Sequence, residues 1–480
     1  MIQTNIIEIS SFKEIELQEL YNSLEDNGNL FLIVQNNMKN ENIFSIIQKT
    51  LKIGYFFINN IICINNHILE NENHLKNSYY NLLWFSKKQD KNKFYKDNIR
   101  EKHIWKDVEW GKREKNYNPK GKDPGNVWIP TEDNGKAVIT HHIILEQEEV
   151  INRILLSTTD EGENVYIKIG TKLNEELLLK ERNIKIEYFE KEYIKRNFSN
   201  KIKNTLNLVA NNSKKKAEVY FKTSEIMEEV KDGEIDLVVT SPPYWDLKNY
   251  FKEGQIGQES YEKYLERLNK VWKECYRILK DDGNVFININ TRTKDKNPIL
   301  IPGDFIKQCQ EIGFSLKDII IWHKSSGIPT SGKNLTDKYE YVLWFTKKYE
   351  REILRDRILE VSDYKNEELN YGNIWNINRK AGSVGKDYVH PAIYPNKLVE
   401  RIVNLFTNEG DTVLDPFLGS GTSLIGAISL NRNFKGYEYN EKFYELIDYR
   451  IKNELNGIEF DLEFKNLNNV ENFQIYRKEK

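Results

Sequence analysis

This 480-residue chain contains an internal repeat: five stretches of its first half recur in the same order in its second half. The partners lie about 247 to 260 residues apart, a narrow band that is typical of a tandem duplication. A shared bias toward Lys, Asn and Ile would explain scattered similarity, but not the common order. We therefore predict two tandem domains, 1–210 and 211–480. The five pairs are 26–36 with 281–291, 78–88 with 338–348, 125–128 with 372–375, 142–165 with 390–413, and 182–193 with 432–443.

The second copy reads as an alternation of strands and helices. Between its apolar runs, the stretch 260–280 has the period of an amphipathic helix, with Ser260 as a plausible N-cap. Such alternation predicts an α/β fold with a mostly parallel, doubly wound sheet. The polar stretch 211–218 is predicted to link the two copies. The expected strands are 235–240, 284–290, 318–323, 340–345, 412–417 and 434–439, and the expected core positions of the helix are Tyr264, Leu268, Val271, Trp272 and Cys275.

Two motifs with a chemical character occur in the second copy and not in the first. TSPPY at 240–244 ends an apolar strand with two prolines, which have no N–H to donate, and presents a hydroxyl and an aromatic ring. DPFLGSGT at 415–422 is a glycine-rich turn after another strand. At the aligned position the first copy has 167–174, with Ile167 opposite Asp415, and we expect it to begin too late to include TSPPY. The first copy is therefore interpreted as a degenerate scaffold.

The glycine-rich turn predicts a site for a nucleoside. Gly419 and Gly421 allow a tight bend and the close approach of a ligand to the backbone, and Asp415 at the strand end is a hydrogen-bond acceptor. About twenty residues further on, Glu438 follows a second strand, where an acidic side chain suits a ribose diol. The glycine spacing matches neither G-x-G-x-x-G nor a P-loop. A nucleoside without a phosphate chain is favoured, and S-adenosylmethionine is the natural candidate.

Together, TSPPY and DPFLGSGT resemble the motifs of the DNA amino-methyltransferases, which methylate N4 of cytosine or N6 of adenine. The stretches GQIGQESYEKYLE, IIIWHKSSGIP and HPAIYPNKLVERIV are also similar to that family, and the resemblance covers about 219–451. The catalytic motif precedes the cofactor motif, which is the permuted β order of the family. The resemblance implies Rossmann-like domains and a site-specific enzyme. The implied cofactor-binding residues are Asp415, Pro416, Phe417, Gly419, Ser420, Gly421, Thr422 and Glu438, and the implied catalytic residues are Ser241, Pro242, Pro243 and Tyr244.

Serine before the two prolines is typical of the N4-cytosine branch of this family. An amine inside a duplex cannot reach the cofactor, so the base must be flipped out, and Tyr244 offers its ring as a stacking face. The Ser241 hydroxyl and the backbone carbonyl of Pro242 can accept the amine hydrogens, which favours the nitrogen geometry that attacks the methyl group. No strong base is required, because the proton can leave late and to solvent. The family usually has an acidic residue after the preceding strand, where this chain has Lys222 and Thr223, with Glu225 slightly late.

Two alternative interpretations remain open. The target could be N6 of adenine, which Ser241 disfavours, or the protein could be a catalytically dead DNA-binding scaffold, which the intact motifs disfavour. C5-cytosine chemistry requires a thiolate nucleophile, and none of Cys63, Cys275 and Cys309 follows a proline or a strand-end motif. These cysteines are far apart, so neither a metal cluster nor a disulfide framework is indicated, and a reducing, cytoplasmic location fits. No apolar run has the length of a membrane span.

With a net charge of −2, a double-stranded DNA partner requires a locally basic surface. In this family a variable segment selects the target sequence, and here it would be about 348–389. The first copy carries a richer basic and aromatic stretch at 104–125, which would complete the DNA cleft. A duplicated chain could act as a monomeric internal pseudo-dimer, and a restriction endonuclease encoded nearby is a possible partner. The candidate DNA contacts are Lys112, Arg113, Lys120, Lys122, Lys324, Arg379, Lys380 and Lys386.

Overall fold

In a computed structural model, the chain forms two compact units. Unit 1 comprises 1–69, 76–198 and 326–339, and unit 2 comprises 70–75, 199–325 and 340–480. The structure describes residues 1–35, 41–64, 75, 77–101, 118–129, 145–190, 214–247, 252–324, 334–351, 353–354, 372–379, 383–384, 388–389 and 394–467. The units follow the order of the two expected domains. The expected boundary after residue 210 lies at 198/199 instead, and the units also exchange two short segments, 70–75 and 326–339.

These two segments occupy equivalent positions of the repeat. Leu335, from the second copy, belongs to the hydrophobic core of unit 1, whereas Leu75, 260 residues earlier, belongs to that of unit 2. In unit 1 the segment is held by main-chain hydrogen bonds, among them Asn126 N–H to the Thr336 carbonyl at 3.0 Å. Burial of an apolar side chain in each core explains why the boundary departs from the order of the sequence.

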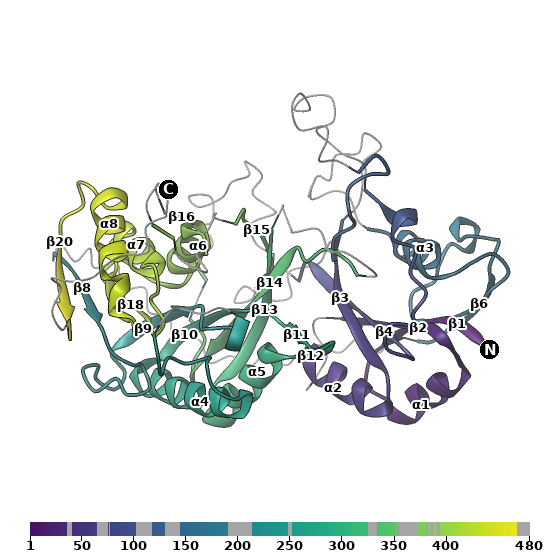
Figure 1. Ribbon diagram of the computed structural model, residues 1–480, viewed down its shortest axis with the longest axis horizontal. Coiled ribbons are helices and arrows are strands. Elements are labelled where there is room, and N and C mark those ends of the chain that lie inside the picture. Colours follow the sequence, from purple (N-terminus) through teal and green to yellow (C-terminus); the bar gives the residue numbers. More distant parts are fainter. Residues whose placement is uncertain are drawn as a thin grey trace. The chain divides into compact units, whose positions relative to one another are not determined.

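Unit 1 is built on a seven-stranded sheet in the order β5-β3-β4-β2-β1-β6-β7. All described pairings are parallel except those of β4 with β2 and with β3. Helices α1 and α2 lie on one side of this sheet and α3 on the other (Figure 1). The bounds are β1 (Ile2–Ile9), α1 (Glu14–Ser23), β2 (Leu24–Gln35), α2 (Ile43–Ile53), β3 (Phe56–Ile64), β4 (Tyr79–Ser86), β5 (Val127–Trp128), α3 (Gln147–Thr158), β6 (Asn164–Ile169) and β7 (Asn183–Tyr188).

Unit 2 repeats this order in a nine-stranded sheet, β15-β13-β14-β10-β9-β18-β19-β8-β20. Helices α4 and α5 lie on one face, and α6, α7 and α8 on the other (Figure 1). The bounds are β8 (Lys215–Tyr220), β9 (Ile235–Thr240), α4 (Tyr261–Ile278), β10 (Leu279–Ile289), α5 (Ile301–Ile312), β13 (Ser315–His323), β14 (Tyr339–Thr346), β15 (Ile374–Asn376), α6 (Asn396–Phe406), β18 (Thr412–Asp415), α7 (Thr422–Ser429), β19 (Asn433–Tyr437), α8 (Tyr444–Glu454) and β20 (Phe460–Lys465), with two short hairpins, β11 (Arg292–Lys294) with β12 (Asn297–Ile299) and β16 (Ser383–Val384) with β17 (Tyr388–Val389).

The predicted α/β class with mostly parallel, doubly wound sheets is therefore confirmed in both units. The helix expected at 260–280 is α4: its five expected core residues are buried, and the Ser260 hydroxyl accepts the Lys263 N–H at 3.3 Å. In β10, β14 and the other central strands nearly every side chain is buried, because helices cover both faces of the sheet.

The duplication extends to single hydrogen bonds. The indole N–H of Trp84 donates to the Asn29 amide oxygen at 2.8 Å, and Trp344 makes the same bond to Asn284 at 2.8 Å. The Arg182 guanidinium donates to the side chain and carbonyl of Thr159, and Arg432 does so to Thr407. Such buried polar pairs belong to the scaffold that both copies share.

The expectation that the first copy begins too late for the catalytic strand is wrong. β1 lies between β2 and β6, as β9 lies between β10 and β18. The sheet register aligns Thr4 with Leu237, because Thr4 faces Asn29 and Leu237 faces Asn284. TSPPY therefore corresponds to Ile7–Ser11, where neither proline nor tyrosine occurs. The first copy therefore has the strand that corresponds to β9, but the residues that follow this strand differ from TSPPY.

The linker predicted at 211–218 is also wrong in its last four residues, since 215–218 belong to strand β8 and 211–213 lie outside the described residues. The charges of this strand are paired across the sheet: the Glu218 carboxylate, only 6% exposed, binds the ammonium groups of Lys435 in β19 and Lys465 in β20. A strand with paired charges lacks the apolar pattern by which strands are recognised in sequence.

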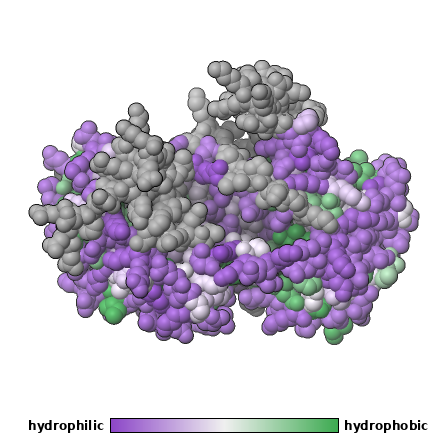
Figure 2. Space-filling view, viewed as in Figure 1, coloured by the Kyte–Doolittle hydropathy of each residue, from purple (hydrophilic) through white to green (hydrophobic). Residues whose placement is uncertain are grey.

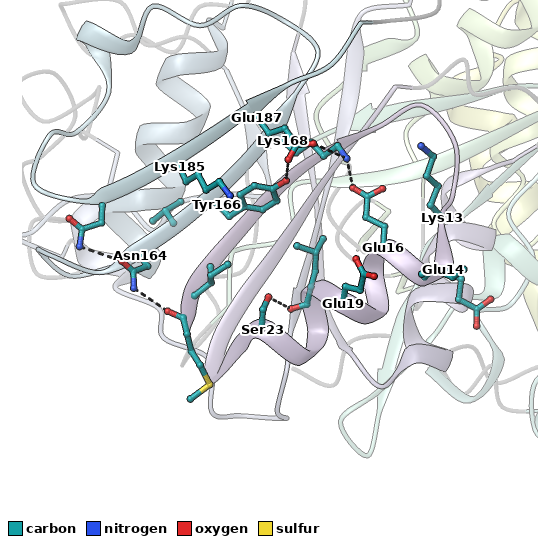
Figure 3. Close-up of a pocket in the computed structure, with 16 residues that line it drawn as sticks. Lys13, Glu14, Glu16, Glu19, Ser23, Asn164, Tyr166, Lys168, Lys185 and Glu187 are labelled. Carbon is teal, nitrogen blue, oxygen red and sulfur yellow. Dashed lines mark hydrogen bonds and ion pairs between the residues drawn. The ribbon is translucent and has the colours of Figure 1, made fainter.

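Unit 1 also has an open groove between α1 and the strands β6 and β7. Glu16 and Lys168 form an ion pair across it at 2.7 Å, and Tyr166 donates to Glu187 at 2.5 Å (Figure 3). In unit 2 the residue aligned with Glu187, Tyr437, donates instead to Glu229, in a loop whose Met227 is buried. None of the predicted site residues lines this groove.

Coloured by hydropathy, the described part of the surface seen in Figure 2 is mostly hydrophilic, with scattered hydrophobic side chains. Among the described residues, no helix combines the length and the apolar composition needed to cross a bilayer.

Candidate active site

The two motifs meet at the carboxyl ends of neighbouring parallel strands. β9 leads into TSPPY, β18 leads into the glycine-rich turn, and the two strands pair directly. The Thr240 hydroxyl donates to the Asp415 carboxylate at 2.6 Å, which joins the motifs through one hydrogen bond. Ligands of open α/β sheets bind outside the carboxyl ends of the strands, so this is the expected position of a site.

Asp415 holds the glycine-rich turn through hydrogen bonds in the interior of the protein. Its side chain is fully buried and accepts hydrogen bonds from Thr240, from the Ser423 hydroxyl at 2.6 Å and from the Phe417 N–H at 2.9 Å. Burial raises the pKa of this carboxyl, while these hydrogen bonds oppose the rise. Asp415 therefore holds the turn through these hydrogen bonds, and its direct contact with a ligand stays a prediction.

The turn itself depends on two glycines and on a buried arginine. Gly419 and Gly421 have φ of 54° and 83°, in the left-handed region that side chains other than glycine rarely adopt. Arg450 of α8 is fully buried and donates to the Ser420 carbonyl at 3.0 Å and to the Thr422 hydroxyl at 2.8 Å. Arg450 was missed in the sequence because it lies 28 residues beyond the motif, inside an ordinary helical pattern.

Of the predicted cofactor-binding residues, Phe417, Gly419 and Glu438 are partly exposed. The other members of the turn, Pro416, Ser420, Gly421 and Thr422, are buried. Glu438 follows β19 and accepts the Gly419 N–H at 2.8 Å and the Asn440 N–H at 2.7 Å. Burial raises the pKa of Glu438 to about 7. A partly exposed carboxylate beside a glycine turn fits the ribose diol of a nucleoside.

The catalytic motif is held rigidly by its neighbours. Tyr264 of α4 donates its hydroxyl to the Pro243 carbonyl at 2.6 Å. Trp245, directly after the motif, has a φ of 51°, and its indole N–H donates to the Glu259 carbonyl at 2.8 Å. A left-handed tryptophan is a strained conformation of the kind that occurs at functional sites. Ser241 and Tyr244 are both partly exposed, so the hydroxyl and the ring remain accessible.

A polar cluster that the sequence did not predict surrounds Tyr244. Its hydroxyl donates to the Glu340 carboxylate at 2.6 Å, and the Asn288 amide nitrogen lies 2.9 Å from the same hydroxyl. The Lys324 ammonium contacts Glu340 at 3.0 Å. Lys324, which was predicted as a DNA contact, therefore lies in an ion pair beside the predicted catalytic motif, and its contact with DNA stays a prediction.

The remaining candidate DNA contacts are only partly described. Lys120 is paired with Asp97 at 2.6 Å and Lys122 with Glu101 at 3.5 Å, both at the surface of unit 1. Arg379 is exposed in unit 2. Lys112, Arg113, Lys380 and Lys386 lie outside the described residues, as does most of the predicted recognition segment 348–389.

Glu225, the late acidic residue after β8, is paired with Arg267 of α4 at 2.7 Å. The three cysteines are buried and free, and burial raises the pKa of each thiol. A buried thiol with a raised pKa is a poor nucleophile, which agrees with the exclusion of C5 chemistry.

A glycine-rich turn thus lies beside a hydroxyl and an aromatic ring that flank two prolines, at the carboxyl end of a doubly wound sheet, and this arrangement is compatible with a methyltransferase. The family model for N6/N4 DNA methylases matches residues 4–224 and again 235–448. The chain belongs to this family of S-adenosylmethionine-dependent DNA methyltransferases. The first match confirms that the degenerate copy derives from the same fold, although Ile167 stands at the position of Asp415 and Tyr188 at that of Glu438.

Among curated relatives, Type II methyltransferase M.MthZI of Methanothermobacter thermautotrophicus is 35% identical over 275 residues, which cover 49% of this chain and 77% of the relative. M.MjaI of Methanocaldococcus jannaschii is 32% identical over 296 residues, covering 52% of this chain and 96% of the relative. Among solved structures, PvuII DNA methyltransferase (cytosine-N4-specific) is 20% identical with a TM-score of 0.42, covering 52% of this chain and 98% of that one.

Proposed function

We propose that this protein transfers a methyl group from S-adenosylmethionine to the exocyclic N4 of a flipped cytosine at a specific DNA site. The observation that carries the proposal is the serine before the two prolines. It directly follows β9, which pairs with β18 and is joined to the glycine-rich turn by the hydrogen bond of Thr240 with Asp415. N6 of adenine is the second candidate, because the same family includes both activities.

The cofactor, when bound, supplies an electrophilic methyl group on a sulfonium. Glu438 would hold the ribose hydroxyls, and Gly419 would let the nucleoside approach the backbone. Ser241 and the Pro242 carbonyl would accept the two N–H hydrogens of the amine, so that the nitrogen lone pair points away from the ring and toward the methyl group. Tyr244 would stack on the flipped base. Positioning accounts for much of the rate, and the proton leaves to solvent.

The test is a nucleoside analysis of DNA methylated by the purified protein. N4-methylcytosine is the expected product. N6-methyladenine would favour the second candidate, and no methylated base together with no cofactor binding in calorimetry would favour the scaffold interpretation. Sequencing with modification detection on DNA from expressing cells then gives the recognition site and shows whether the site suits a restriction-modification system.

Cofactor affinity is expected to rise with pH. With a pKa of about 7, Glu438 is largely protonated at pH 6 and largely ionised at pH 8, and only the ionised carboxylate accepts hydrogen bonds with both oxygens. The affinity for S-adenosylmethionine should increase about tenfold across this interval. Calorimetry at both pH values measures the change. Glu438→Gln cannot titrate at this position, so the pH dependence of affinity that remains in this variant is the part due to the ligand's own amine. An equal pH dependence in that variant would contradict the assignment.

The first copy is proposed to complete the DNA-binding cleft within a monomer that acts as an internal pseudo-dimer. The leucines exchanged between the two cores support joint folding of the copies. One cofactor equivalent per chain is expected in calorimetry, because the first copy lacks Asp415, the glycine turn and Glu438 at the aligned positions. Two equivalents per chain would overturn this proposal. Such a pair need not be symmetric and could read a non-palindromic site.

Neutralising Lys112, Arg113, Lys120 and Lys122 together with glutamine is expected to weaken DNA binding and to reduce its salt dependence. Each phosphate contact contributes about 0.9 to the slope of the logarithm of the binding constant against the logarithm of salt concentration. Fluorescence anisotropy at several salt concentrations measures this slope. The matched control neutralises four exposed lysines of α4 and α5, Lys263, Lys270, Lys273 and Lys307. Equal losses in the two variants would show that only total charge matters.

A further inference from the structure

We infer that Glu340 is a positioning residue for methyl transfer, which acts by fixing the Tyr244 ring before the target base arrives. The inference rests on the proposed amino-methyl transfer at TSPPY. It concerns a carboxylate on β14, a strand that contributes no motif residue, and the three groups that converge on it: Tyr244, Asn288 and Lys324.

The contacts of Glu340 account for both of its oxygens. Oε2 accepts the Tyr244 hydroxyl at 2.6 Å and the Asn288 amide at 2.8 Å, and Oε1 contacts the Lys324 ammonium at 3.0 Å. Tyr244 follows β9, Lys324 directly follows β13, Asn288 lies near the end of β10 and Glu340 near the start of β14, so all four lie at the carboxyl end of the parallel strands. β14 runs antiparallel to β10, so its first residues reach the edge at which the parallel strands end.

The burial of this cluster makes its geometry stiff. Side-chain exposure is 19% for Glu340 and 15% for Lys324, and Asn288 is 5% exposed. A carboxylate removed from water to this degree requires its partners, because an unpaired buried charge is costly. A Tyr244 ring that is tied through its hydroxyl to such an anchor has little freedom to rotate. A stacking surface that is already ordered lowers the entropy cost of holding the flipped base.

The two copies of the fold provide an internal comparison. Both copies have the tryptophan–asparagine hydrogen bond, Trp84 to Asn29 in the first and Trp344 to Asn284 in the second. The register places Tyr80 at the position of Glu340 and Ile33 at that of Asn288. Ser11 stands at the position of Tyr244. The cluster is therefore present in the copy that has TSPPY and replaced in the copy without it, which separates it from the shared scaffold.

Single-turnover methyl transfer with the full-length protein tests this inference in a double-mutant cycle. Glu340→Gln and Tyr244→Phe are each expected to lower the transfer rate about tenfold, since the first removes the charge that strengthens this hydrogen bond and the second removes the hydrogen bond itself. The double variant is expected to be no slower than the slower single variant, because both changes break the same link. S-adenosylmethionine affinity should stay within about twofold of the wild type, since Glu340 makes no contact with the glycine turn.

The control is Glu350→Gln, which breaks the ion pair of Glu350 with Lys317 close to the other end of β14 and should leave the rate unchanged. A hundredfold loss in the double variant would overturn the inference, because independent effects multiply. It would show that Glu340 acts independently of Tyr244. A wild-type rate in Glu340→Gln would also overturn it. Absence of methyl transfer by the wild-type protein would instead contradict the proposed function, so the two failures are distinguishable.

Discussion

Gly421→Val is expected to reduce S-adenosylmethionine affinity about 100-fold, or ~3 kcal/mol. The cause is backbone strain rather than a clash, because a Cβ at this position would meet Ile447 at 3.5 Å, an ordinary contact, whereas the φ of 83° is forbidden to a β-branched residue. The turn would have to rearrange, and Gly419 and the Glu438 carboxylate it binds would move with it. Calorimetry of the folded variant measures the loss.

Gly457→Val is the matched control for this prediction. Gly457 has a φ of 85° in the same unit, and no heavy atom lies within 4 Å of the added Cβ, so the strain is equal and the cofactor turn is untouched. Both variants should lose similar unfolding free energy in denaturant titrations, about 1–2 kcal/mol. Normal affinity in Gly421→Val, or an equal loss of affinity in Gly457→Val, would mean that the pocket lies elsewhere.

Tyr244→Ala is expected to lower the rate of methyl transfer at least about 100-fold while cofactor affinity is retained. Stacking on the flipped base is worth about 1–3 kcal/mol. The variant also removes the hydroxyl that binds Glu340 and Asn288. Glu340 keeps its contacts with Asn288 and Lys324, so the added loss is that of one hydrogen bond to a charged group, about 1.5–3 kcal/mol. Rapid-quench single-turnover kinetics with saturating cofactor measures the rate.

Tyr244→Phe separates the two contributions, because it keeps the ring and removes only the hydroxyl. Its loss should be about tenfold, between the wild type and Tyr244→Ala. If Tyr244→Ala transfers methyl groups at the wild-type rate, the tyrosine is not part of the site. If the alanine and phenylalanine variants are equally slow, stacking contributes nothing and the ring serves only to carry its hydroxyl.

The glycine turn and the catalytic motif were predictable from the sequence because their chemistry is local. Strand β9 is a run of apolar residues closed by two prolines, and β18 leads into glycines at positive φ. The apolar period of 260–280 predicted the α4 helix, and the common order of the five matching pairs predicted the duplication. Each signal lies within a few residues, where periodicity and backbone preference are strong.

The residues that support the site could not be predicted in this way. Asn288 and Glu340 are polar residues inside strands that otherwise read as buried, and they contact Tyr244 from 44 and 96 positions away. In the sequence, Arg450 is an ordinary arginine of an amphipathic helix. Only the fold brings its guanidinium to the Ser420 carbonyl and the Thr422 hydroxyl, to which it donates hydrogen bonds. The first four residues of β8, 215–218, were predicted as part of a linker. The charge of Glu218 is paired with Lys435 and Lys465, which lie 217 and 247 positions away in the sequence.

By itself, the amino-acid sequence determined the α/β class, the tandem copies, the position of the two motifs and the absence of a cofactor turn from the first copy. Tertiary structure alone decided that Asp415 is an internal brace, that Lys324 pairs with Glu340, and that Leu75 and Leu335 belong to cores other than those their order suggests. The physical reason is that periodicity and turn chemistry depend on neighbours in the chain. Buried charges and apolar side chains instead find their partners among residues that are distant in the sequence and that only folding brings into contact.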